Sequence, residues 1–287
     1  MKKILVLYHK NCPDGFGGAW AAWKKFGNKA EYVAVDPDTL PEKFPKGKEI
    51  YSVDISYPVS VQKKLREKNK SLVILDHHVS RKNDTEAFPE NTFNNNHSGA
   101  VLGWRYFHPK KKVPKFLEYI EDYDLWKFSL PKTRSIIPYL HMQKTDFITW
   151  GEMADQLEKR NWEKIYYERG MLLQKYEDKI VADLIKKADL VLFERKKVYA
   201  VNSSLSNIVD KIAHNLCLKK QPFSIVWHER RGELKVSLRA DGKIDVSKIA
   251  QKYGGGGHKS ASGFVIKNGK KPWKMVKTKD KKPKTKD

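Results

Sequence analysis

Acidic, imidazole and thiol side chains follow three short apolar runs in the first third of the chain. They are His9, Cys12, Asp14, Asp54 and the triplet Asp76-His77-His78. A buried carboxylate without a partner is costly, and clustered carboxylates need cations to offset their repulsion. Oxygen and nitrogen ligands together suit Mn²⁺, Mg²⁺, Fe²⁺ or Zn²⁺, and Mn²⁺ is favoured where carboxylates dominate. These residue types therefore predict a divalent-metal site.

Each of these residues also has an ordinary structural explanation when taken alone. A single aspartate at a strand end is often a helix cap, and a single histidine is often structural. The triplet Asp76-His77-His78 is different, because it directly follows the apolar run Leu-Val-Ile-Leu. Three adjacent polar groups in that place need hydrogen-bond partners or ions, and packing does not explain them.

A second unusual segment lies near the end of the chain, where Tyr253 is followed by four glycines and then by His258. Successive glycines give up side-chain packing and cost ordering entropy. Such a run is either a flexible linker or a place where backbone N–H groups approach an anion. The run lies between a predicted helix and a predicted strand, which favours contact with phosphate through Gly255, Gly256, Gly257 and His258.

The elements that must position these groups alternate between strand and helix. Short apolar runs rich in branched residues predict strands at residues 3–8, 32–35, 50–55 and 72–75, with a helix at 59–68. This alternation predicts a parallel sheet with helices on its faces. In such a sheet the residues after each strand open into one crevice.

The remaining segments predict two further parts of an α/β protein. Residues 1–150 form the N-terminal parallel-sheet domain, and helical spacing of apolar residues predicts a connector at 151–188. A smaller α/β domain follows at 189–267. Its expected elements are strands at 190–201, 223–228, 234–239 and near Phe264, and helices at 204–217 and 246–253.

The chain of 287 residues is strongly basic, with a formal net charge of +23. Its lysine-rich end, residues 268–287, is expected to be a solvated, disordered tail. The excess of lysine elsewhere fits a polyanionic substrate, although a coding bias explains dispersed lysines equally well. No long apolar run predicts a membrane span, and two cysteines, Cys12 and Cys217, fit a reducing cytoplasm.

Two motifs together carry a resemblance to a known family. Asp76-His77-His78, with Asp14-Gly15 and Asp54 upstream, resembles the DHH-family phosphoesterases, and the string from Gly254 to Gly263 resembles their DHH-associated C-terminal domain. The resemblance covers nearly all of the chain up to about residue 267. It is nearest to the short two-domain members, of the oligoribonuclease and 3′-phosphoadenosine 5′-phosphate phosphatase type.

The resemblance implies two divalent ions, usually Mn²⁺, and a role for each residue that matches the family pattern. His9, Asp14 and His77 would be ligands, Asp54 would bridge the ions, Asp76 would orient its histidine neighbour and His78 would face the substrate. A further bridging aspartate is expected near residue 120, where Asp122 is favoured over Asp124. His97 lies in a segment similar to one near the family's site, or is a surface residue. In the second domain Arg239 would anchor phosphate through its guanidinium, with an exposed strand arginine as the alternative.

Cys12 departs from the family pattern, because it stands where the first of two acidic residues is expected. A thiolate ligand would favour a softer metal such as Zn²⁺ or Fe²⁺. The alternative, which we favour from the sequence alone, is that Cys12 does not ligate and leaves one metal site weaker.

The expected activity is metal-dependent hydrolysis of phosphodiester or phosphomonoester bonds in short nucleotides. We expect a 3′→5′ exonuclease on short RNA or single-stranded DNA; 3′-phosphoadenosine 5′-phosphate, dinucleotides and polyphosphate are alternative substrates. A rival from another class is a non-catalytic nucleic-acid-binding protein with a degenerate metal site. The expected partners are a short nucleic acid or nucleotide and no membrane, and a homodimer is left open.

Overall fold

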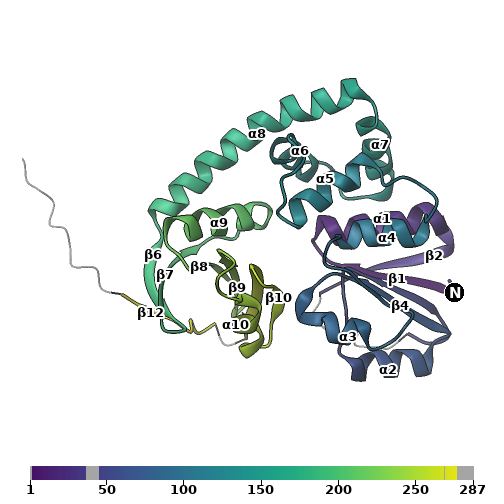
Figure 1. Ribbon diagram of the computed structural model, residues 1–287, viewed down its shortest axis with the longest axis horizontal. Helices are drawn as coiled ribbons and strands as arrows, with labels where there is room; N and C mark the ends of the chain where they lie inside the picture. Colours follow the sequence, from purple (N-terminus) through teal and green to yellow (C-terminus); the bar gives the residue numbers. More distant parts are fainter. Residues whose placement is uncertain (1, 37–44, 268, 277–287) are drawn as a thin grey trace, which may run out of the picture. The chain divides into compact units, whose positions relative to one another are not determined.

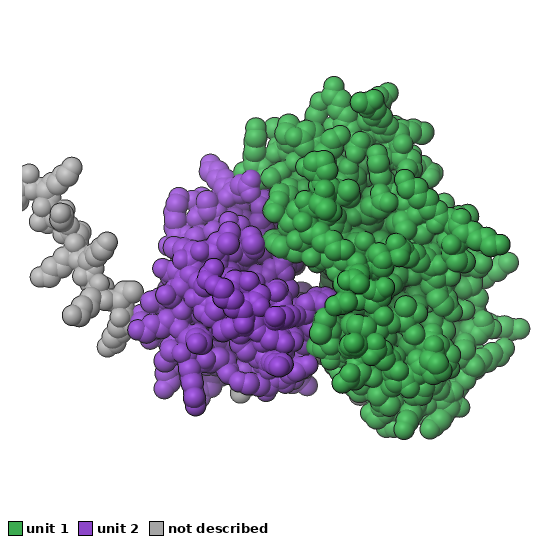
Figure 2. All heavy atoms as spheres, in the orientation of Figure 1, with its two compact units in different colours: residues 1–176 green, residues 177–287 purple. Residues whose placement is uncertain are grey.

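The chain divides into two compact units. The computed structural model describes residues 2–36, 45–267 and 269–276, and its units are Met1–Tyr176 and Glu177–Asp287 (Figure 2). Each unit has its own sheet and its own apolar cores. The α/β class predicted from the sequence is confirmed.

The sheet of the first unit is parallel throughout. Its strands lie in the order β2-β1-β3-β4-β5, and every neighbouring pair runs in the same direction. The strands are β1 (Ile4–His9), β2 (Ala30–Val35), β3 (Glu49–Val53), β4 (Ser71–Asp76) and β5 (Thr92–Phe93). The chain moves outward from β1 in one direction and from β3 in the other. The carboxyl ends of β1 and β3 therefore flank the point where parallel sheets of this kind bind ligands.

Helices cover both faces of this sheet (Figure 1). Alternation along β1 sends Val6 into the core shared with α1 and α4, and Leu5 and Leu7 into the core shared with α2. The two large helices of the first face are α1 (Pro13–Phe26) and α4 (Gly99–Phe107); α2 (Val59–Lys68) and α3 (Lys82–Glu86) lie on the other. Short 3₁₀ helices occupy Gly27–Lys29, Val79–Arg81 and Ser206–Ile208.

Four more helices follow in the sequence. They are α5 (Lys115–Asp124), α6 (Thr133–His141), α7 (Phe147–Leu157) and α8 (Arg160–Lys186). The helical connector expected at 151–188 corresponds to the end of α7 and the whole of α8, and α8 runs through the boundary between the two units. Trp150 and Tyr166 are buried in the core of the first unit. The first unit therefore continues into the segment that the sequence assigned to the connector.

The second unit has a seven-stranded mixed sheet in the order β10-β11-β9-β8-β7-β6-β12. Only β7 and β8 are parallel among its described pairs. Helix α10 packs on one face and α9, with the end of α8, on the other. The elements are β6 (Asp189–Phe193), β7 (Lys196–Asn202), α9 (Val209–Lys219), β8 (Phe223–Arg230), β9 (Glu233–Ala240), α10 (Val246–Lys252), β10 (Gly256–His258), β11 (Ala261–Ile266) and β12 (Lys274–Met275).

The single strand predicted at residues 190–201 is instead a hairpin. Strands β6 and β7 pair antiparallel around a two-residue turn, Glu194 and Arg195, whose φ angles are 46° and 62°. Positive φ at both central residues is the backbone of the tight turns that match strand twist. Such turns usually carry Asn or Gly. This turn has neither, so the sequence does not predict it.

The second unit also continues beyond the predicted boundary at 267. Trp273 is buried in its core at 8% exposure, Met275 pairs with Val191, and the N–H of Val276 donates to Leu190 O at 2.9 Å. The expectation of a disordered tail from residue 268 is therefore wrong for residues 269–276. The composition there is rich in lysine, but the one tryptophan, Trp273, is buried in the core of the second unit. The rest of the expected tail, residues 277–287, lies outside the described residues. Within the described part of the chain, no helix is both long and apolar enough to cross a bilayer.

Candidate metal centre

Side chains from five elements of the first unit gather at the carboxyl edge of its sheet. His9 ends β1, Asp54 directly follows β3, and Asp76 ends β4. Asp14 comes from the first turn of α1, and Asp124 is the last residue of α5. The side chains at the strand ends therefore lie close together, as the sequence predicted.

Asp54 lies at the centre of the cluster, with one carboxylate oxygen toward each of two imidazoles. Its Oδ2 is 3.2 Å from His9 Nδ1, and its Oδ1 is 3.0 Å from His77 Nε2. The side chain is 2% exposed, and the residue has a φ of 61°. A left-handed conformation costs a non-glycine residue about 1–3 kcal/mol and is found mainly where function requires it.

Two of the possible metal-ligand groups in this cluster contain or contact Asp54. His9, Cys12 and Asp54 offer ligand atoms within 4.8 Å of one another, and so do Asp14, His77 and Asp124. His77 Nε2 lies 3.5 Å from Asp14 Oδ2 and 3.7 Å from Asp124 Oδ2. The carboxylate of Asp54 therefore touches histidines that belong to both groups.

The N-terminus of α4 holds Asp14 in place. The N–H groups of Gly99 and Ala100 donate to its two carboxylate oxygens at 2.6 and 2.9 Å. Unsatisfied N–H groups and the helix dipole both favour a negative charge at this position. Gly99 also has no room for a side chain, because a Cβ there would lie 2.6 Å from Asp54 Cβ. The sequence pattern pointed to His97 in this stretch and did not predict these two backbone donors. Ser98, which caps α4, marks the helix start that supplies them.

Asp76 orients the two histidines that follow it. Its Oδ1 accepts hydrogen bonds from the N–H groups of His77 and His78 at 2.7 and 3.2 Å and lies 2.7 Å from His78 Nδ1. Asp76 is fully buried, and its Oδ2 has no hydrogen-bond partner among the residues that the structure describes. The side chain of His78 is 22% exposed. Asp76 therefore fixes the ring of His78 through Nδ1 and turns Nε2 away from this carboxylate.

Burial and mutual repulsion shift the ionisation of this cluster. Burial and the charge of Asp54 raise the pKa of Asp14 to about 6. Burial alone would raise the pKa of Asp54, but hydrogen bonds from His77 and His9 hold it well below its usual value. Burial alone would lower the pKa of His77, but Asp54 and Asp124 raise it well above its usual value. A divalent cation would thus bind here in competition with protons on the imidazoles.

The structure does not place Asp122, the favoured bridging aspartate, in the cluster. Its carboxylate accepts hydrogen bonds from the N–H and Oγ of Ser129 at 2.7 and 2.6 Å, from the N–H of Leu130 at 3.2 Å and from Thr133 Oγ1. Two positions on a helix differ by about 200°, so Asp122 and Asp124 point to opposite sides of α5. The preference for Asp122 is therefore corrected: Asp124, the alternative, is the residue that reaches the cluster.

His97 is also held away from the metal-ligand groups. Its Nδ1 lies 3.1 Å from Glu121 Oε2, and its Nε2 lies 2.7 Å from Arg105 Nη1. Glu121 also accepts a hydrogen bond from the N–H of Ser98 at 2.9 Å. His97 is therefore part of the support for the start of α4.

Cys12 lies in the cluster. It directly precedes α1, and its Sγ lies within 4.8 Å of ligand atoms of His9 and Asp54. Burial, together with the charges of Asp54, Asp124 and Asp14, raises the pKa of the thiol well above its usual value. The position where the sequence pattern lacks an acid is thus filled by a sulfur atom beside two ligand candidates.

In the second unit, the strand register aligns two cationic candidates. Ala261 of β11 pairs with Arg239 of β9 on one side and with His258 of β10 on the other. Directly opposed residues in an antiparallel sheet share a face, so Arg239 and His258 flank a small alanine. Arg239 is 7% exposed, and its Nη1 lies 3.9 Å from Asp210 Oδ1. The alternative of an exposed strand arginine is therefore excluded.

The glycine run forms the edge of the same sheet. Gly256 pairs with Gly263, and a Cβ on Gly255 would lie 2.0 Å from Gly263 O. Gly257 has a φ of 130°, which L side chains rarely adopt. The flexible-linker alternative is therefore excluded, and close backbone packing accounts for at least part of the glycine content.

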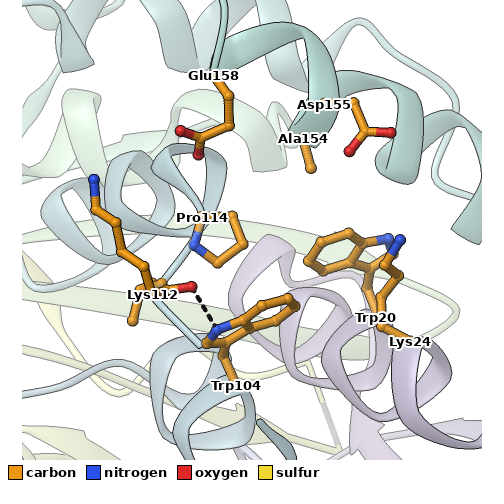
Figure 3. A pocket seen from close by; sticks show the side chains of 9 residues that line it. Trp20, Lys24, Trp104, Lys112, Pro114, Ala154, Asp155 and Glu158 are labelled. Atoms are coloured by element: carbon orange, nitrogen blue, oxygen red, sulfur yellow. Dashed lines mark hydrogen bonds between the residues drawn. The ribbon is translucent and has the colours of Figure 1, made fainter. Parts of the chain in front are cut away.

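A separate cavity of about 250 Å³ lies in the first unit (Figure 3). Its wall includes the indoles of Trp20 and Trp104, which stack with centroids 5.5 Å apart. Charged residues in its wall are Lys24, Lys112, Asp155 and Glu158. Glu158 accepts a hydrogen bond from the N–H of Lys115 at 2.7 Å, at the start of α5. The described lining contains none of the metal-ligand candidates.

Comparisons with known proteins show what the chain is similar to. Residues 191–282 match the DHHA1 domain. The fold is similar to the DHH domain of a member of the S1p family of ribosomal proteins, with a TM-score of 0.54 over 96% of this chain and 83% of that chain at 12% identity. The C-terminal segment therefore matches the DHHA1 domain, and the chain has a fold similar to that of a DHH-domain protein.

Two further proteins are similar to this chain. An uncharacterised protein of Acanthamoeba polyphaga mimivirus is 29% identical over 292 residues, which cover 91% of this chain and 67% of the viral protein. The exonuclease RecJ bound to manganese aligns with 92% of this chain and 86% of its own, with a TM-score of 0.49 and 14% identity.

The cluster of aspartates and histidines in the first unit fits divalent metal ions. It combines four aspartates with three histidines, and it leaves the fully buried Asp76 Oδ2 without a partner among the described residues. Carboxylates at this density require compensating positive charge. Mixed oxygen and nitrogen donors are those that Mn²⁺, Mg²⁺, Fe²⁺ and Zn²⁺ accept.

Proposed function

We propose that the chain is a metal-dependent phosphoesterase acting on short nucleotides. The observation that carries this proposal is the position of Asp54, whose two oxygens face His9 in one ligand group and His77 in the other. A carboxylate shared by two groups of ligands is the arrangement that a two-metal hydrolase needs.

The two ions would be held by the two groups already described. His9 and Asp54 would serve one position, and Asp14, His77 and Asp124 the other. Mn²⁺ is the favoured ion, with Mg²⁺, Fe²⁺ and Zn²⁺ as alternatives. When bound, such ions supply a nucleophilic water at neutral pH and neutralise charge on phosphate oxygens.

His78 is the proposed catalytic side chain of the protein itself. Asp76 holds its Nδ1 at 2.7 Å, so that Nε2 is directed away from this carboxylate. The ring is partly exposed and therefore accessible to a substrate. A histidine fixed in this manner can contact the phosphate and hold or give a proton at Nε2.

The second unit supports a phosphate-rich substrate. Arg239 and His258 lie on one face of its sheet, on either side of Ala261, and a guanidinium binds phosphate with two parallel hydrogen bonds. The basic composition of the chain is in keeping with such a substrate. We propose 3′→5′ hydrolysis of short RNA or single-stranded DNA, with 3′-phosphoadenosine 5′-phosphate, dinucleotides and polyphosphate as further members of the class.

A panel of these substrates tests the proposal. The chelator-treated protein is incubated with and without Mn²⁺ and with short RNA, short DNA, the phosphoadenosine compound, a cyclic dinucleotide and polyphosphate. We expect Mn²⁺-dependent hydrolysis of at least one nucleotide. Hydrolysis of none of them by protein that binds Mn²⁺ would contradict the proposal and favour a non-catalytic nucleic-acid-binding protein.

A further inference from the structure

We propose that Cys12 is a thiolate ligand of the metal position formed with His9 and Asp54. The inference rests on the proposed metal-dependent function and adds to it a sulfur donor in place of an acid. It assigns this position to thiophilic ions, such as Zn²⁺, Fe²⁺ or Co²⁺, and leaves the position of Asp14, His77 and Asp124 to oxygen-preferring ions.

The geometry places the sulfur where a ligand is needed. Cys12 Sγ, His9 and Asp54 offer three ligand atoms that all lie within 4.8 Å of one another. His9 and Cys12 belong to the connection from β1 to α1, and Asp54 directly follows β3. Two backbone segments, brought together by the pairing of β1 with β3, thus place one sulfur, one nitrogen and one oxygen close to one another.

Cys12 has no evident role in capping the helix that it precedes. Its side chain makes no cap hydrogen bond within the described residues, and the helix begins with Pro13, which suits that position. Side chains do cap three other helices, at Ser98, Asp146 and Asp245, whereas the N-cap residues of α2, α3, α5, α6 and α9 make no such hydrogen bond. Cys12 belongs with the second set, so helix capping does not explain the cysteine.

Packing does not account for Cys12 either. Buried cysteines behave as small apolar residues, and Cys217 is of that kind at 3% exposure. Cys12 is only partly buried, and its neighbours are an imidazole and carboxylates. Carboxylates offer the sulfur atom no apolar contact. A bound cation would interact favourably with the sulfur and with the carboxylates, so Cys12 is a metal-ligand candidate.

The proposed position has a chemical consequence for metal choice. Thiolate ligands select Zn²⁺ and other soft ions over Mn²⁺ and Mg²⁺. Three protein ligands leave a place for water or substrate, as in catalytic zinc sites. The neighbouring group has two carboxylates and one imidazole, which suit Mn²⁺ or Mg²⁺. The two positions are therefore expected to differ in their preferred ion.

Cobalt binding tests the proposal directly. The metal-free full-length protein is titrated with Co²⁺ without oxygen, and absorption is recorded for bound cobalt and for the near-ultraviolet charge transfer from sulfur to cobalt. Wild type is compared with Cys12→Ser, Cys12→Asp and the control Cys217→Ser. Far-ultraviolet circular dichroism checks that each variant is folded.

We expect the sulfur-to-cobalt band in wild type and in Cys217→Ser, and its loss in Cys12→Ser and Cys12→Asp. Because the chain has only two cysteines, retention of the band in Cys217→Ser assigns it to Cys12 even if a Cys12 variant fails to fold. Zn²⁺ affinity should fall at least about 10-fold in Cys12→Ser.

Cobalt bound by wild type without the sulfur band would overturn the Cys12 assignment and leave the proposed function standing. Wild-type protein that binds no cobalt would contradict the metal centre as a whole. A band that persists in folded Cys12→Ser would also overturn the assignment.

Discussion

Two aspartates on α5 show how residue identity alone fails to assign a site. Asp122 and Asp124 have the same chemistry and lie two positions apart, but Asp122 accepts hydrogen bonds from the segment 129–133, whereas Asp124 lies 3.7 Å from His77. The first stabilises the turn after α5, and the second contributes charge to the cluster. A substitution of Asp122 should therefore mainly lower stability, and a substitution of Asp124 should mainly lower activity.

We expect Asp122→Asn to lower the free energy of unfolding by about 1–3 kcal/mol, because an amide cannot accept from all the donors that now surround the carboxylate. Asp124→Asn should leave stability within about 0.5 kcal/mol and lower Mn²⁺-dependent hydrolysis at least about 100-fold. Denaturant melts and rates for both variants measure this contrast. Equal activity in wild type and folded Asp124→Asn would remove Asp124 from the site.

His108, directly after α4, should make stability depend on pH. Its Nε2 lies 2.9 Å from Ala21 O, and burial together with Lys111, Lys25 and Lys24 lowers its pKa. At pH values near and below ~6.5, His108 therefore binds a proton more readily in the unfolded chain than in the folded one. The stability that comes with the neutral His108 is present above that pH and is lost as the pH falls.

The measurement is the free energy of unfolding of wild type and His108→Gln at about pH 7 and pH 5. We expect wild type to lose more stability than the variant on acidification. Equal losses would show that His108 is not the source of the pH dependence.

At the scale of elements, the metal centre depends on how closely α4 approaches the ends of β1 and β3. The first N–H groups of α4 hold Asp14, and Gly99 lies against Asp54 without space for a methyl group. The cluster is thus positioned by main-chain atoms as much as by side chains. A substitution at Gly99 should disturb the site without touching any ligand.

Gly99→Ala should lower Mn²⁺-dependent hydrolysis at least about 10-fold and the free energy of unfolding by about 1–3 kcal/mol, because the added methyl lies 2.6 Å from Asp54 Cβ. The matched control is Gly151→Ala within α7, where the methyl meets only Trp20 Nε1 at 3.9 Å. That control should leave hydrolysis unchanged and raise stability by up to about 1 kcal/mol. A fully active Gly99→Ala protein would contradict the role of the close contact between Gly99 and Asp54.

The sequence predicted the strand ends well because a parallel sheet gathers them at one edge. His9, Asp54 and Asp76 therefore followed from the strands alone. The choice between Asp122 and Asp124 did not, because it depends on the rotation of α5, which only tertiary packing sets. The turn at Glu194 and Arg195 also lies beyond sequence patterns, because it lacks the Asn or Gly typical of such turns. Ser98 marks the start of α4, but the approach of the Gly99 and Ala100 N–H groups to Asp14 depends on tertiary packing.

At the scale of the whole molecule, the basic end of the chain has two different parts. Residues 269–276 belong to the second unit, where Trp273 packs near Phe193 and Trp227. Residues 277–287 contain six lysines and two aspartates. The first part should contribute to folding, and the second should contribute charge.

Trp273→Ala should lower the free energy of unfolding of the second unit by about 3–5 kcal/mol, because it removes a large buried side chain. Deletion of residues 277–287 should change it by less than about 0.5 kcal/mol and should reduce the salt dependence of oligonucleotide binding. Thermal or denaturant melts followed by tryptophan fluorescence distinguish the two. A melt unchanged by Trp273→Ala would contradict the placement of this segment in the core.

On the proposed function, Asp54 joins two metal positions in one hydrolytic centre. The deciding measurement is equilibrium dialysis of chelator-treated wild type and Asp54→Asn against saturating Mn²⁺ and, because the position beside Cys12 is proposed to prefer softer ions, against saturating Co²⁺. We expect two ions per chain in wild type with at least one of these metals and a loss of one or both in the folded variant. One ion or none in wild type with both metals, or the same two ions in Asp54→Asn, would contradict the shared metal centre.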